Sequence, residues 1–327
     1  MKQMIFTLSL LVATAFCALA QEVEMTTYTY THKDDVALCM DVYRVASAEE
    51  QPCLIYIFGG AFLAGSRAEE EVIEVYDYFA RRGWTVVAID YRLGLLPLLE
   101  EPDARRSLLD FRAMLLDAIR MATEDLLDAT AFVVTNAKQL NINPNQIVTL
   151  GSSAGAIAAC QAEWAICNSR PEAAVLPPSF NYAGVISMAG AICAPSRRLQ
   201  WAKEACPMML FHGNADRNVP YDRQSLFGVS LFGSEAIAES LQERGWSYWF
   251  YDADNMDHNL SWRPMYFLRE EIERFAERMV FGSERLQIRQ IVSDLSLPEC
   301  DHDFGLRDYI EANFAPGKPH GVDAATY

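Results

Sequence analysis

The clearest chemical signal in the sequence is a serine among small residues. Residues 151–155 read Gly-Ser-Ser-Ala-Gly, and they lie between an apolar run ending at Leu150 and a stretch of helical spacing. In that context the G-x-S-x-G pattern predicts a nucleophile elbow, a turn so tight that the serine backbone is strained and its neighbours must be small. Such a turn exposes the hydroxyl at the positive end of the following helix. We therefore predict that Ser153 is a nucleophile; Ser152 occupies the variable position, which disfavours it.

A serine nucleophile needs a base that takes its proton and an acid that orients the base. Asp216 lies on a loop after the apolar run 208–211, and His258 lies on a loop after the next run, 246–251. We predict that His258 is the general base. Asp216 is then the acid that fixes the imidazole tautomer and stabilises the imidazolium.

Other residues could fill the same two roles. Asp252, Asp254 and Asp257 lie close to His258 in the sequence and are rival acids, although a solvated loop also explains them. The remaining histidines fit other positions: His32 in a predicted hairpin, His212 at the end of a strand with its side chain turned inward, and His302 and His320 in the C-terminal tail. These positions leave His258 as the preferred base.

A second signal is a glycine pair that follows the apolar run 53–58. An oxyanion needs backbone N–H groups that converge where no side chain intervenes, and two glycines on such a loop supply that geometry. We assign an oxyanion hole to the N–H groups of Gly60, Ala61 and Ala154. An ordinary glycine turn is the alternative, and the neighbouring serine motif disfavours it.

Short apolar runs alternate with helical stretches along most of the chain. The apolar runs are 53–58, 84–89, 147–150, 183–189, 208–211 and 246–251, and the helical stretches are 69–82, 104–140, 154–167, 234–245 and 262–279. Runs without polar alternation fit strands buried on both faces of a parallel sheet. The alternation predicts an α/β fold with a mostly parallel central sheet and helices on both faces. Residues 26–33 and 37–44 predict an N-terminal antiparallel hairpin.

The N-terminus has the pattern of a targeting segment. Lys2 precedes an apolar run over residues 4–19, and small residues lead up to Ala20. This pattern predicts a signal peptide over residues 1–20 with cleavage between Ala20 and Gln21. The protein is therefore expected to be secreted or periplasmic. The run is too short for a membrane span, so no stable membrane insertion is expected after cleavage.

The rest of the chain is divided at the end of the alternating pattern. We predict a catalytic domain over residues 21–282 and a C-terminal appendage, a helix and an extended tail, over residues 283–327. The 327 residues are 51% hydrophobic, which suits a folded globular protein with a large core. A net charge of −17 repels phosphate backbones and anionic membranes, so nucleic acid is not an expected partner.

The cysteines do not form a recognisable framework. Their spacings fit no zinc motif, and we expect no metal. Cys160 and Cys167 would lie two turns apart on one helix, too far for a disulfide. Cys193 and Cys206 flank a short connection between two predicted strands and are the best candidates for a pair. Buried free thiols are the preferred interpretation for most of the others.

Taken in order, these motifs resemble the α/β-hydrolase superfamily, and within it the carboxylesterase/lipase branch. The resemblance rests on residues 59–62, on Asp90-Tyr91-Arg92, on the 151–155 motif and on the block 212–220 with its aspartate. The order of Ser153, Asp216 and His258 is the chain order of that superfamily. The resemblance implies an α/β-hydrolase fold and hydrolysis of carboxylic esters through an acyl-enzyme, without a metal or a cofactor.

Two features separate the chain from many of these relatives. Phe58 stands where many have the histidine of His-Gly-Gly-Gly, which changes the shape of the loop but not its backbone donors. The connection between Ala189 and Met208 is short, which disfavours the large lid of an interfacial lipase. Some similar bacterial esterases with signal peptides act on esterified plant polysaccharides. The expected substrate is therefore a small-molecule or carbohydrate ester.

The substrate pocket and the reaction class both leave alternatives. Phe62, Leu95, Leu96 and Phe227 are candidate pocket residues, and burial in the core explains them equally well. A serine peptidase on the same fold is the second hypothesis, because the block around Asp216 also resembles that of prolyl-peptidase relatives. A non-catalytic binding protein with a retired hydrolase fold is the third, and the intact order of the three candidate residues argues against it.

Overall fold

A nine-stranded sheet forms the centre of the computed structural model. The structure describes residues 22–33, 35–101, 104, 106–226, 229–300, 302, 304–305 and 311–312. In spatial order the strands are β1 (Val23–Lys33), β2 (Val36–Val45), β4 (Thr85–Ile89), β3 (Gln51–Ile57), β5 (Ile142–Ser152), β6 (Gly184–Met188), β8 (Met208–Gly213), β11 (Tyr248–Asp254) and β12 (Gln287–Ser293). From β4 to β12 all neighbouring strands are parallel, so their carboxyl ends lie along one edge.

The N-terminal hairpin is antiparallel, as predicted. β1 pairs with β2, and β2 joins the parallel strands through an antiparallel pairing with β4. Every residue of β4 and of β6 is buried, which shows that both faces of the central sheet are covered. The predicted α/β fold with a mostly parallel sheet is therefore confirmed.

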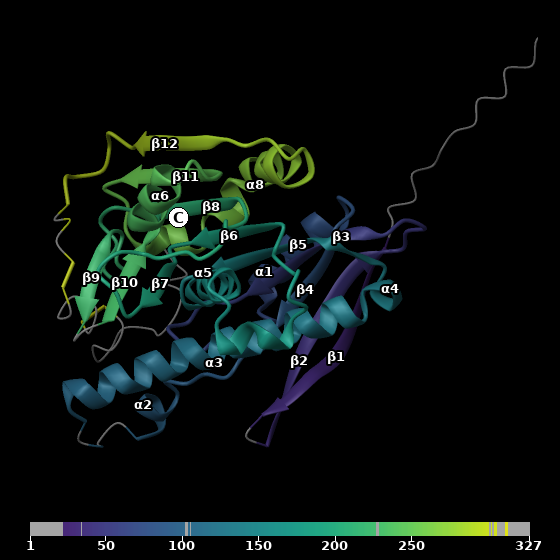
Figure 1. Cartoon of the computed structure of the whole chain (residues 1–327), viewed down its shortest axis with the longest axis horizontal. Helices are drawn as coiled ribbons and strands as arrows, with labels where there is room; N and C mark the ends of the chain where they lie inside the picture. Colours follow the sequence, from purple (N-terminus) through teal and green to yellow (C-terminus); the bar gives the residue numbers. More distant parts are fainter. Residues whose placement is uncertain are drawn as a thin grey trace, which may run out of the picture.

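Helices cover the two faces of the sheet (Figure 1). They are α1 (Glu70–Ala80), α2 (Pro97–Glu100), α3 (Leu108–Thr135), α4 (Ala137–Leu140), α5 (Ala154–Cys167), α6 (Ser234–Glu243), α7 (Pro264–Phe267) and α8 (Arg269–Phe275), with a π-helical turn at Ala276–Phe281 and 3-10 turns at Pro171–Val175 and His258–Ser261. α1 and α8 lie together, joined by a hydrogen bond of 3.0 Å from Tyr78 to Glu273. α3 packs along α5 on the other face.

The long helix α3 begins at a capping box. The Ser107 hydroxyl accepts a hydrogen bond from the Asp110 N–H, and the Asp110 carboxylate accepts one from the Ser107 N–H. This reciprocal arrangement satisfies two N–H groups that the first turn of a helix leaves without partners. It fixes where α3 starts, near the carboxyl edge of the sheet.

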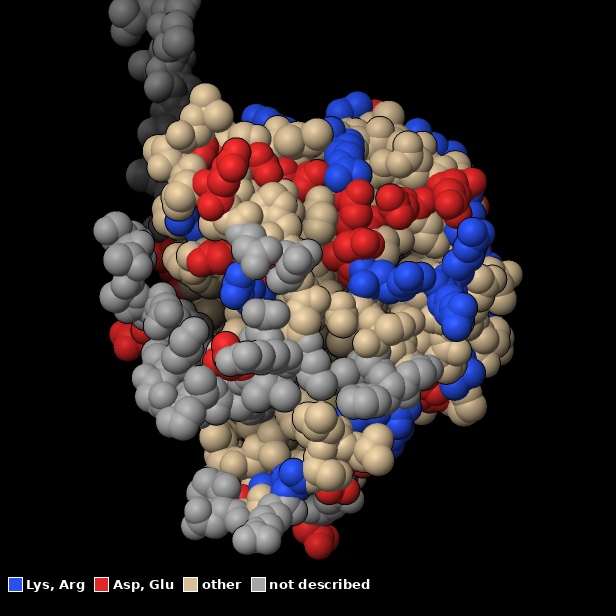
Figure 2. Space-filling view, turned by 90° about the vertical axis from the view of Figure 1, so that its left-hand side faces the viewer, with Lys and Arg blue, Asp and Glu red and all other residues tan. Residues whose placement is uncertain are grey.

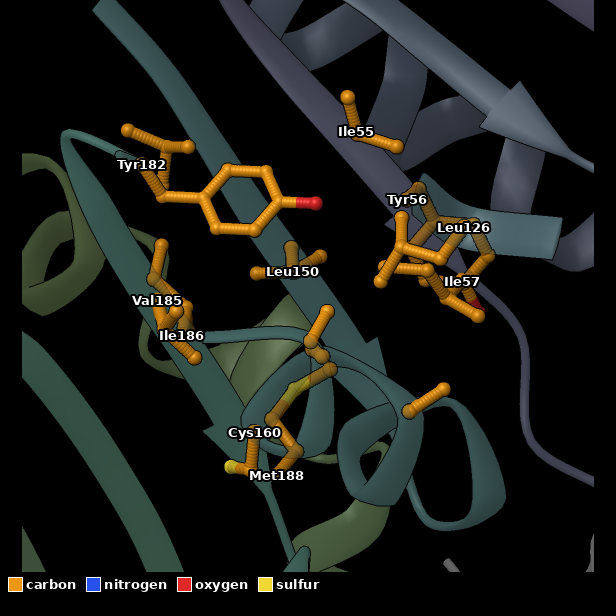
Figure 3. Close-up of a cluster of buried hydrophobic side chains, with 14 of the residues drawn as sticks. Ile55, Tyr56, Ile57, Leu126, Leu150, Cys160, Tyr182, Val185, Ile186 and Met188 are labelled. Carbon is orange, nitrogen blue, oxygen red and sulfur yellow. The ribbon is translucent and has the colours of Figure 1, made fainter. Parts of the chain in front are cut away.

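Buried apolar side chains pack on both faces of the middle of the sheet, and Figure 3 shows some of them. Side chains that are at most 1% exposed include Ile55 and Ile57 from β3 and Val185 from β6 on the face of α3 and α5, with Leu126 and Cys160 from those helices, and Leu150, Ile186 and Met188 on the opposite face. Burying each large aliphatic side chain contributes about 1.5–3 kcal/mol. This packing holds β5 and β6 rigidly at the middle of the sheet, directly below residues 151–155.

The structure has two features that the sequence did not predict. β7 (Ala191–Ala194), β9 (Arg223–Leu226) and β10 (Val229–Gly233) form a separate three-stranded sheet in the order β7-β10-β9. It lies on the side of the molecule toward which the arrowheads of β11 and β12 point (Figure 1). The other is β12, which pairs with β11 at the edge of the main sheet, so this part of residues 283–327 is not a separate helix or tail.

The candidate disulfide between Cys193 and Cys206 is absent, which corrects that prediction. All seven cysteines of the described residues are free thiols. The backbone N–H of Cys193 donates to the Gln161 side chain at 2.8 Å, and that of Cys206 donates to Glu163 at 2.7 Å. The two residues are therefore fixed by different side chains of α5.

Residues 1–20 of the predicted signal peptide and the cleavage site before Gln21 lie outside the described residues. Within the described part of the chain, none of the helices combines the length and apolar character that crossing a bilayer requires.

Candidate active site

Ser153 sits in a strained turn between β5 and α5. Its φ of 49° and ψ of −114° lie in a region that residues with a side chain rarely adopt. The Ser153 N–H donates to the Met188 carbonyl at 2.9 Å, which ties the turn to the end of β6. The hydroxyl therefore projects from the carboxyl edge of the sheet.

The glycines on either side of Ser153 are required by close backbone approaches. A methyl group at Gly151 would collide with the backbone of Gly155 and Ala156, and one at Gly155 would collide with the carbonyl oxygens of Ile57 and Phe58. Only residues without a side chain let β5, α5 and β3 come this close. The turn has the steric character that the sequence motif predicts.

His258 bridges Ser153 and Asp216. Its Nε2 lies 2.8 Å from the Ser153 Oγ, and its Nδ1 lies 2.7 Å from the Asp216 Oδ2. A carboxylate accepts hydrogen bonds and does not donate them, so the imidazole carries its proton on Nδ1. Nε2 is then free to accept the proton of the Ser153 hydroxyl. The structure thus brings together the three residues that were predicted as nucleophile, base and acid.

Asp216 is held as a buried carboxylate. Its Oδ1 accepts hydrogen bonds from the N–H groups of Asn218 at 2.7 Å and Val219 at 3.0 Å. Burial by itself raises the pKa of Asp216, but the neighbouring His258 and His212 outweigh burial and hold the pKa of this carboxyl well below its usual value. Asp216 therefore stays a carboxylate well below the pH at which an ordinary aspartate is protonated.

A second histidine contacts Asp216 from inside the core. His212 is fully buried, and its Nε2 lies 3.2 Å from the Asp216 Oδ2 and 3.3 Å from the Val219 carbonyl. Its Nδ1 lies 2.9 Å from the Ser234 Oγ. Because Nε2 faces two acceptors, it carries the proton and Nδ1 accepts from Ser234. The sequence predicts the inward orientation of His212 but gives no sign of its contact with Asp216.

The rival acids have other partners. Asp252 binds Arg289 at 2.7 Å, Asp254 accepts from Asn214 at 2.8 Å, and Asp257 accepts from the Asn259 N–H at 3.0 Å. The other described histidines, His32 on β1 and His302, are exposed, and His320 lies outside the described residues. The geometry therefore favours Asp216 and His258 over these alternatives.

The glycine loop, residues 58–62, lies against the turn at Ser153. A methyl group built on Gly59 would be 3.3 Å from the Ser153 Cβ. Within the described residues, the N–H groups of Gly60 and Ala61 donate to no protein acceptor. Ala154 is the first residue of α5, so its N–H has no acceptor in the helix. The three donors predicted for an oxyanion hole are thus unpaired and close to the Ser153 turn.

The candidate pocket residues divide into three groups. Phe62 and Leu95 are 1% and 0% exposed, which favours burial in the core, the alternative that the sequence left open for them. Leu96 is half-buried and stays a prediction. Phe227 lies outside the described residues.

Figure 2 shows the face that Figure 1 presents on its left, where acidic and basic side chains lie side by side around a largely uncharged surface.

The described residues contain no group of three histidines, cysteines or carboxylates arranged to hold a metal ion. The chemistry that the site itself can perform is proton transfer coupled to nucleophilic attack. A hydroxyl in contact with a neutral imidazole, an oriented acid and unpaired amide donors is the set of groups that acyl transfer requires.

Sequence comparisons relate the N-terminal half of the chain to esterases. Residues 12–165 match the model of the Carboxylesterase family. Gut esterase 1 of Caenorhabditis elegans is 28% identical over 137 residues, which cover 41% of this chain and 21% of that protein. Fumonisin B1 esterase of Sphingopyxis macrogoltabida is 30% identical over 109 residues, which cover 33% of this chain and 18% of that protein. The matched part thus spans about a fifth of each relative.

Structural comparisons extend the likeness over most of the chain. An esterase of Thermogutta terrifontis with bound propionate superposes with a TM-score of 0.54 at 21% identity, covering 81% of this chain and 95% of that one. The same esterase phosphorylated by paraoxon gives a TM-score of 0.52 at 22% identity, covering 77% and 94%. At this level of identity the likeness concerns the fold, and it confirms the predicted α/β-hydrolase fold.

Proposed function

We propose that this chain, which has the α/β-hydrolase fold and resembles carboxylesterases over residues 12–165, is a serine hydrolase that cleaves carboxylic esters through an acyl-enzyme. One observation carries the proposal: a serine with a φ of 49° lies 2.8 Å from an imidazole nitrogen, and the other nitrogen lies 2.7 Å from a buried carboxylate. Neutral Nε2 in contact with a hydroxyl is the arrangement of a base poised to take its proton.

Acylation follows from these contacts. The Ser153 Oγ attacks the ester carbonyl carbon while Nε2 of His258 takes its proton, and the carbonyl oxygen becomes an oxyanion. The free N–H groups of Gly60, Ala61 and Ala154 stabilise that charge, and Asp216 stabilises the imidazolium. Collapse of the intermediate breaks the bond to the alcohol oxygen, which receives the proton from His258. The acyl group remains on Ser153.

Deacylation repeats the cycle with water. His258 takes a proton from water as the water oxygen attacks the acyl carbonyl, and the resulting oxyanion uses the same donors. When the intermediate collapses, Ser153 leaves and receives its proton from His258, which releases the carboxylic acid. The site can therefore complete a turnover with its own side chains.

Small esters are the substrate class that we propose. The Thermogutta terrifontis esterase, a structural neighbour, has been solved with propionate and with butyrate bound, which supports a short acyl group. We include acyl esters of carbohydrates in this class, on the basis of the similarity of the sequence motifs to polysaccharide-acting esterases. Initial rates with acetyl, butyryl and feruloyl esters and with aminoacyl amides would rank these substrates, and a preference for the amides would favour a peptidase instead.

The proposal is tested by comparing two adjacent serines. Ser153→Ala should lower kcat on a p-nitrophenyl butyrate substrate by about 10⁴-fold or more, because no other group replaces the nucleophile. Ser152→Ala is the matched control and should stay within a few-fold of the unmutated protein. Equal rates for Ser153→Ala and the unmutated protein would overturn the proposal.

We also propose that the protein is exported, with residues 1–20 removed as a signal peptide. The pattern of Lys2, the apolar run 4–19 and the small residues before Gln21 supports this. N-terminal sequencing of protein recovered outside the cytoplasm should begin at Gln21. Recovery of cytoplasmic protein that begins at Met1 would contradict the proposal.

A further inference from the structure

Tyr91 is a buried tyrosine whose side chain contacts the glycine loop, residues 58–62. It follows β4 and is 3% exposed. Its hydroxyl lies 3.0 Å from the Phe58 carbonyl oxygen and 3.2 Å from that of Gly59, and it donates to these two acceptors. One side chain from a neighbouring strand end thus holds two consecutive carbonyl groups of the loop that leads to Gly60 and Ala61.

The ring of Tyr91 makes further contacts with the same loop. It stacks on Phe58 with a centroid distance of 4.4 Å and an interplanar angle of 25°. It also meets Phe62 edge-on at 6.3 Å and 74°. The Leu95 N–H, from the segment that follows Tyr91, donates to the Phe62 carbonyl at 3.0 Å. Residues 91–95 therefore contact both ends of the loop, at Phe58 and at Phe62.

The orientation of the Gly59 carbonyl determines the direction of a catalytic donor. The Gly59–Gly60 peptide is trans, so its C=O and its N–H point to opposite sides of the chain. When the hydroxyl of Tyr91 fixes the Gly59 oxygen, it also aims the Gly60 N–H away from Tyr91. Rotation of this peptide plane would move the donor out of the oxyanion hole.

The loop needs such support because its backbone is strained. Gly60, Ala61 and Phe62 have φ values of 105°, 54° and 59°, and the last two are unfavourable for residues with a side chain. A strained segment keeps its conformation only when its surroundings over-determine it. Since the Gly60 and Ala61 N–H groups have no acceptor in the described residues, the carbonyl groups and rings are what fix the loop.

We propose that Tyr91 is a positioning residue that aims the backbone donors of the oxyanion hole, a role that rests on the proposed function. Tyr91 does not contact the substrate; it acts through the Gly59–Gly60 peptide. Burial raises the pKa of the Tyr91 hydroxyl well above its ordinary value, so the group stays protonated and remains a donor throughout the working pH range.

The test is the removal of one hydroxyl. Tyr91→Phe keeps the ring contacts with Phe58 and Phe62 and should lower kcat for p-nitrophenyl butyrate about tenfold or more, with KM within about threefold, because the donors stabilise the transition state rather than the bound ester. Affinity for a trifluoromethyl ketone, which forms an oxyanion on Ser153, should fall in parallel. Tyr76→Phe is the matched control: Tyr76 is similarly buried, and its hydroxyl donates to the Arg67 carbonyl at 2.9 Å, not to Phe58 or Gly59.

A second variant separates positioning from simple stability. With 4-aminophenylalanine in place of Tyr91, an N–H donor remains at the same place, and kcat should return to within a few-fold of the unmutated protein. A Tyr91→Phe variant with unchanged kcat, or an aminophenylalanine variant as slow as Tyr91→Phe, would overturn the inference. If the unmutated protein cleaves no faster than Ser153→Ala, the proposed function itself fails, which is a distinct outcome.

Discussion

At the scale of single residues, Asp216 connects the catalytic geometry to the core. It is the only one of the four candidate acids whose carboxylate reaches His258, and it also accepts two backbone N–H groups and faces His212. A charged group in such a dry site is stable only when every acceptor position is used. The orientation of the base therefore depends on a carboxylate that cannot move.

Replacing this carboxylate tests that role. Asp216→Asn should lower kcat by about 10³–10⁴-fold, because an amide can donate to His258 Nδ1 and then favours the wrong tautomer. Asp257→Asn is the matched control: Asp257 precedes His258 directly, is exposed, and its carboxylate accepts from the Asn259 N–H rather than from the imidazole. The measurement is kcat for both variants on the same ester. A loss of less than tenfold for Asp216→Asn, or an equal loss for Asp257→Asn, would count against the assignment.

Residue identities in the site are more predictable from sequence than their contacts. Ser153, Asp216 and His258 are recognisable because each follows a strand and because their order is informative. The contact of His212 with Asp216 and that of Tyr91 with Gly59 depend on how neighbouring strands are aligned, and no local pattern encodes that alignment. The burial of Phe62 and Leu95 is hidden for the same reason, since an apolar loop residue fits a pocket wall or a core equally well.

At the scale of elements, α5 has an unusual environment for a helix. All of its residues are buried, including Glu163, which is 0% exposed. One oxygen of Glu163 accepts from the Cys206 N–H at 2.7 Å and from Asn181 and Cys167 at 3.2 Å each. Burial raises the pKa of Glu163, and these hydrogen bonds offset only part of that effect.

A raised pKa makes the stability of the fold depend on pH in a defined direction. The folded state binds the Glu163 proton more tightly than the unfolded state, so this contribution is complete below the ordinary pKa of glutamate, about 4.3, and is lost as pH rises through the raised pKa. The measurement is the difference in Tm between the unmutated protein and Glu163→Gln. We expect this difference to shift against the unmutated protein as pH increases from about 4 toward 8. Glu243→Gln, at an exposed position of α6, is the control for the removal of one carboxylate from a helix. A Tm difference for Glu163→Gln that is flat or grows with pH would contradict this account.

The main elements are predictable because long apolar runs and helical periodicity are strong signals. The six predicted inner strands all appear, whereas β7, β9 and β10 have four or five residues each, too few for alternation to be recognised. β12 escapes prediction because its sequence has neither a continuous apolar run nor strict apolar alternation, and none of its residues is buried. Its place is set by pairing with β11, which is a property of the whole sheet.

At the scale of the whole molecule, β12 closes the far edge of the sheet. It pairs in parallel with β11 over seven residues, and Arg289 binds Asp252 of β11 and Glu235 of α6 at 2.7 Å each. The stability of the C-terminal half of the sheet, which presents Asp216 and His258, should therefore depend on residues beyond 282.

Two truncations test this dependence. A chain that ends at residue 282 should lose at least ~5 °C in Tm and aggregate more readily, because the edge of β11 would be exposed. A chain that ends at residue 300 keeps β12 and is the control, with a Tm close to that of the full chain. Equal Tm and solubility for the two truncated chains would show that β12 is dispensable.

The most direct test of the central claim is the site of covalent labelling by a fluorophosphonate. Such a probe reacts with a serine whose hydroxyl is activated by a base and whose surroundings stabilise an oxyanion. We expect peptide mass spectrometry to find stoichiometric modification of Ser153 in the native protein. Ser153→Ala and the denatured protein should not react. A native protein that stays unlabelled, or one labelled at another residue, would contradict the account.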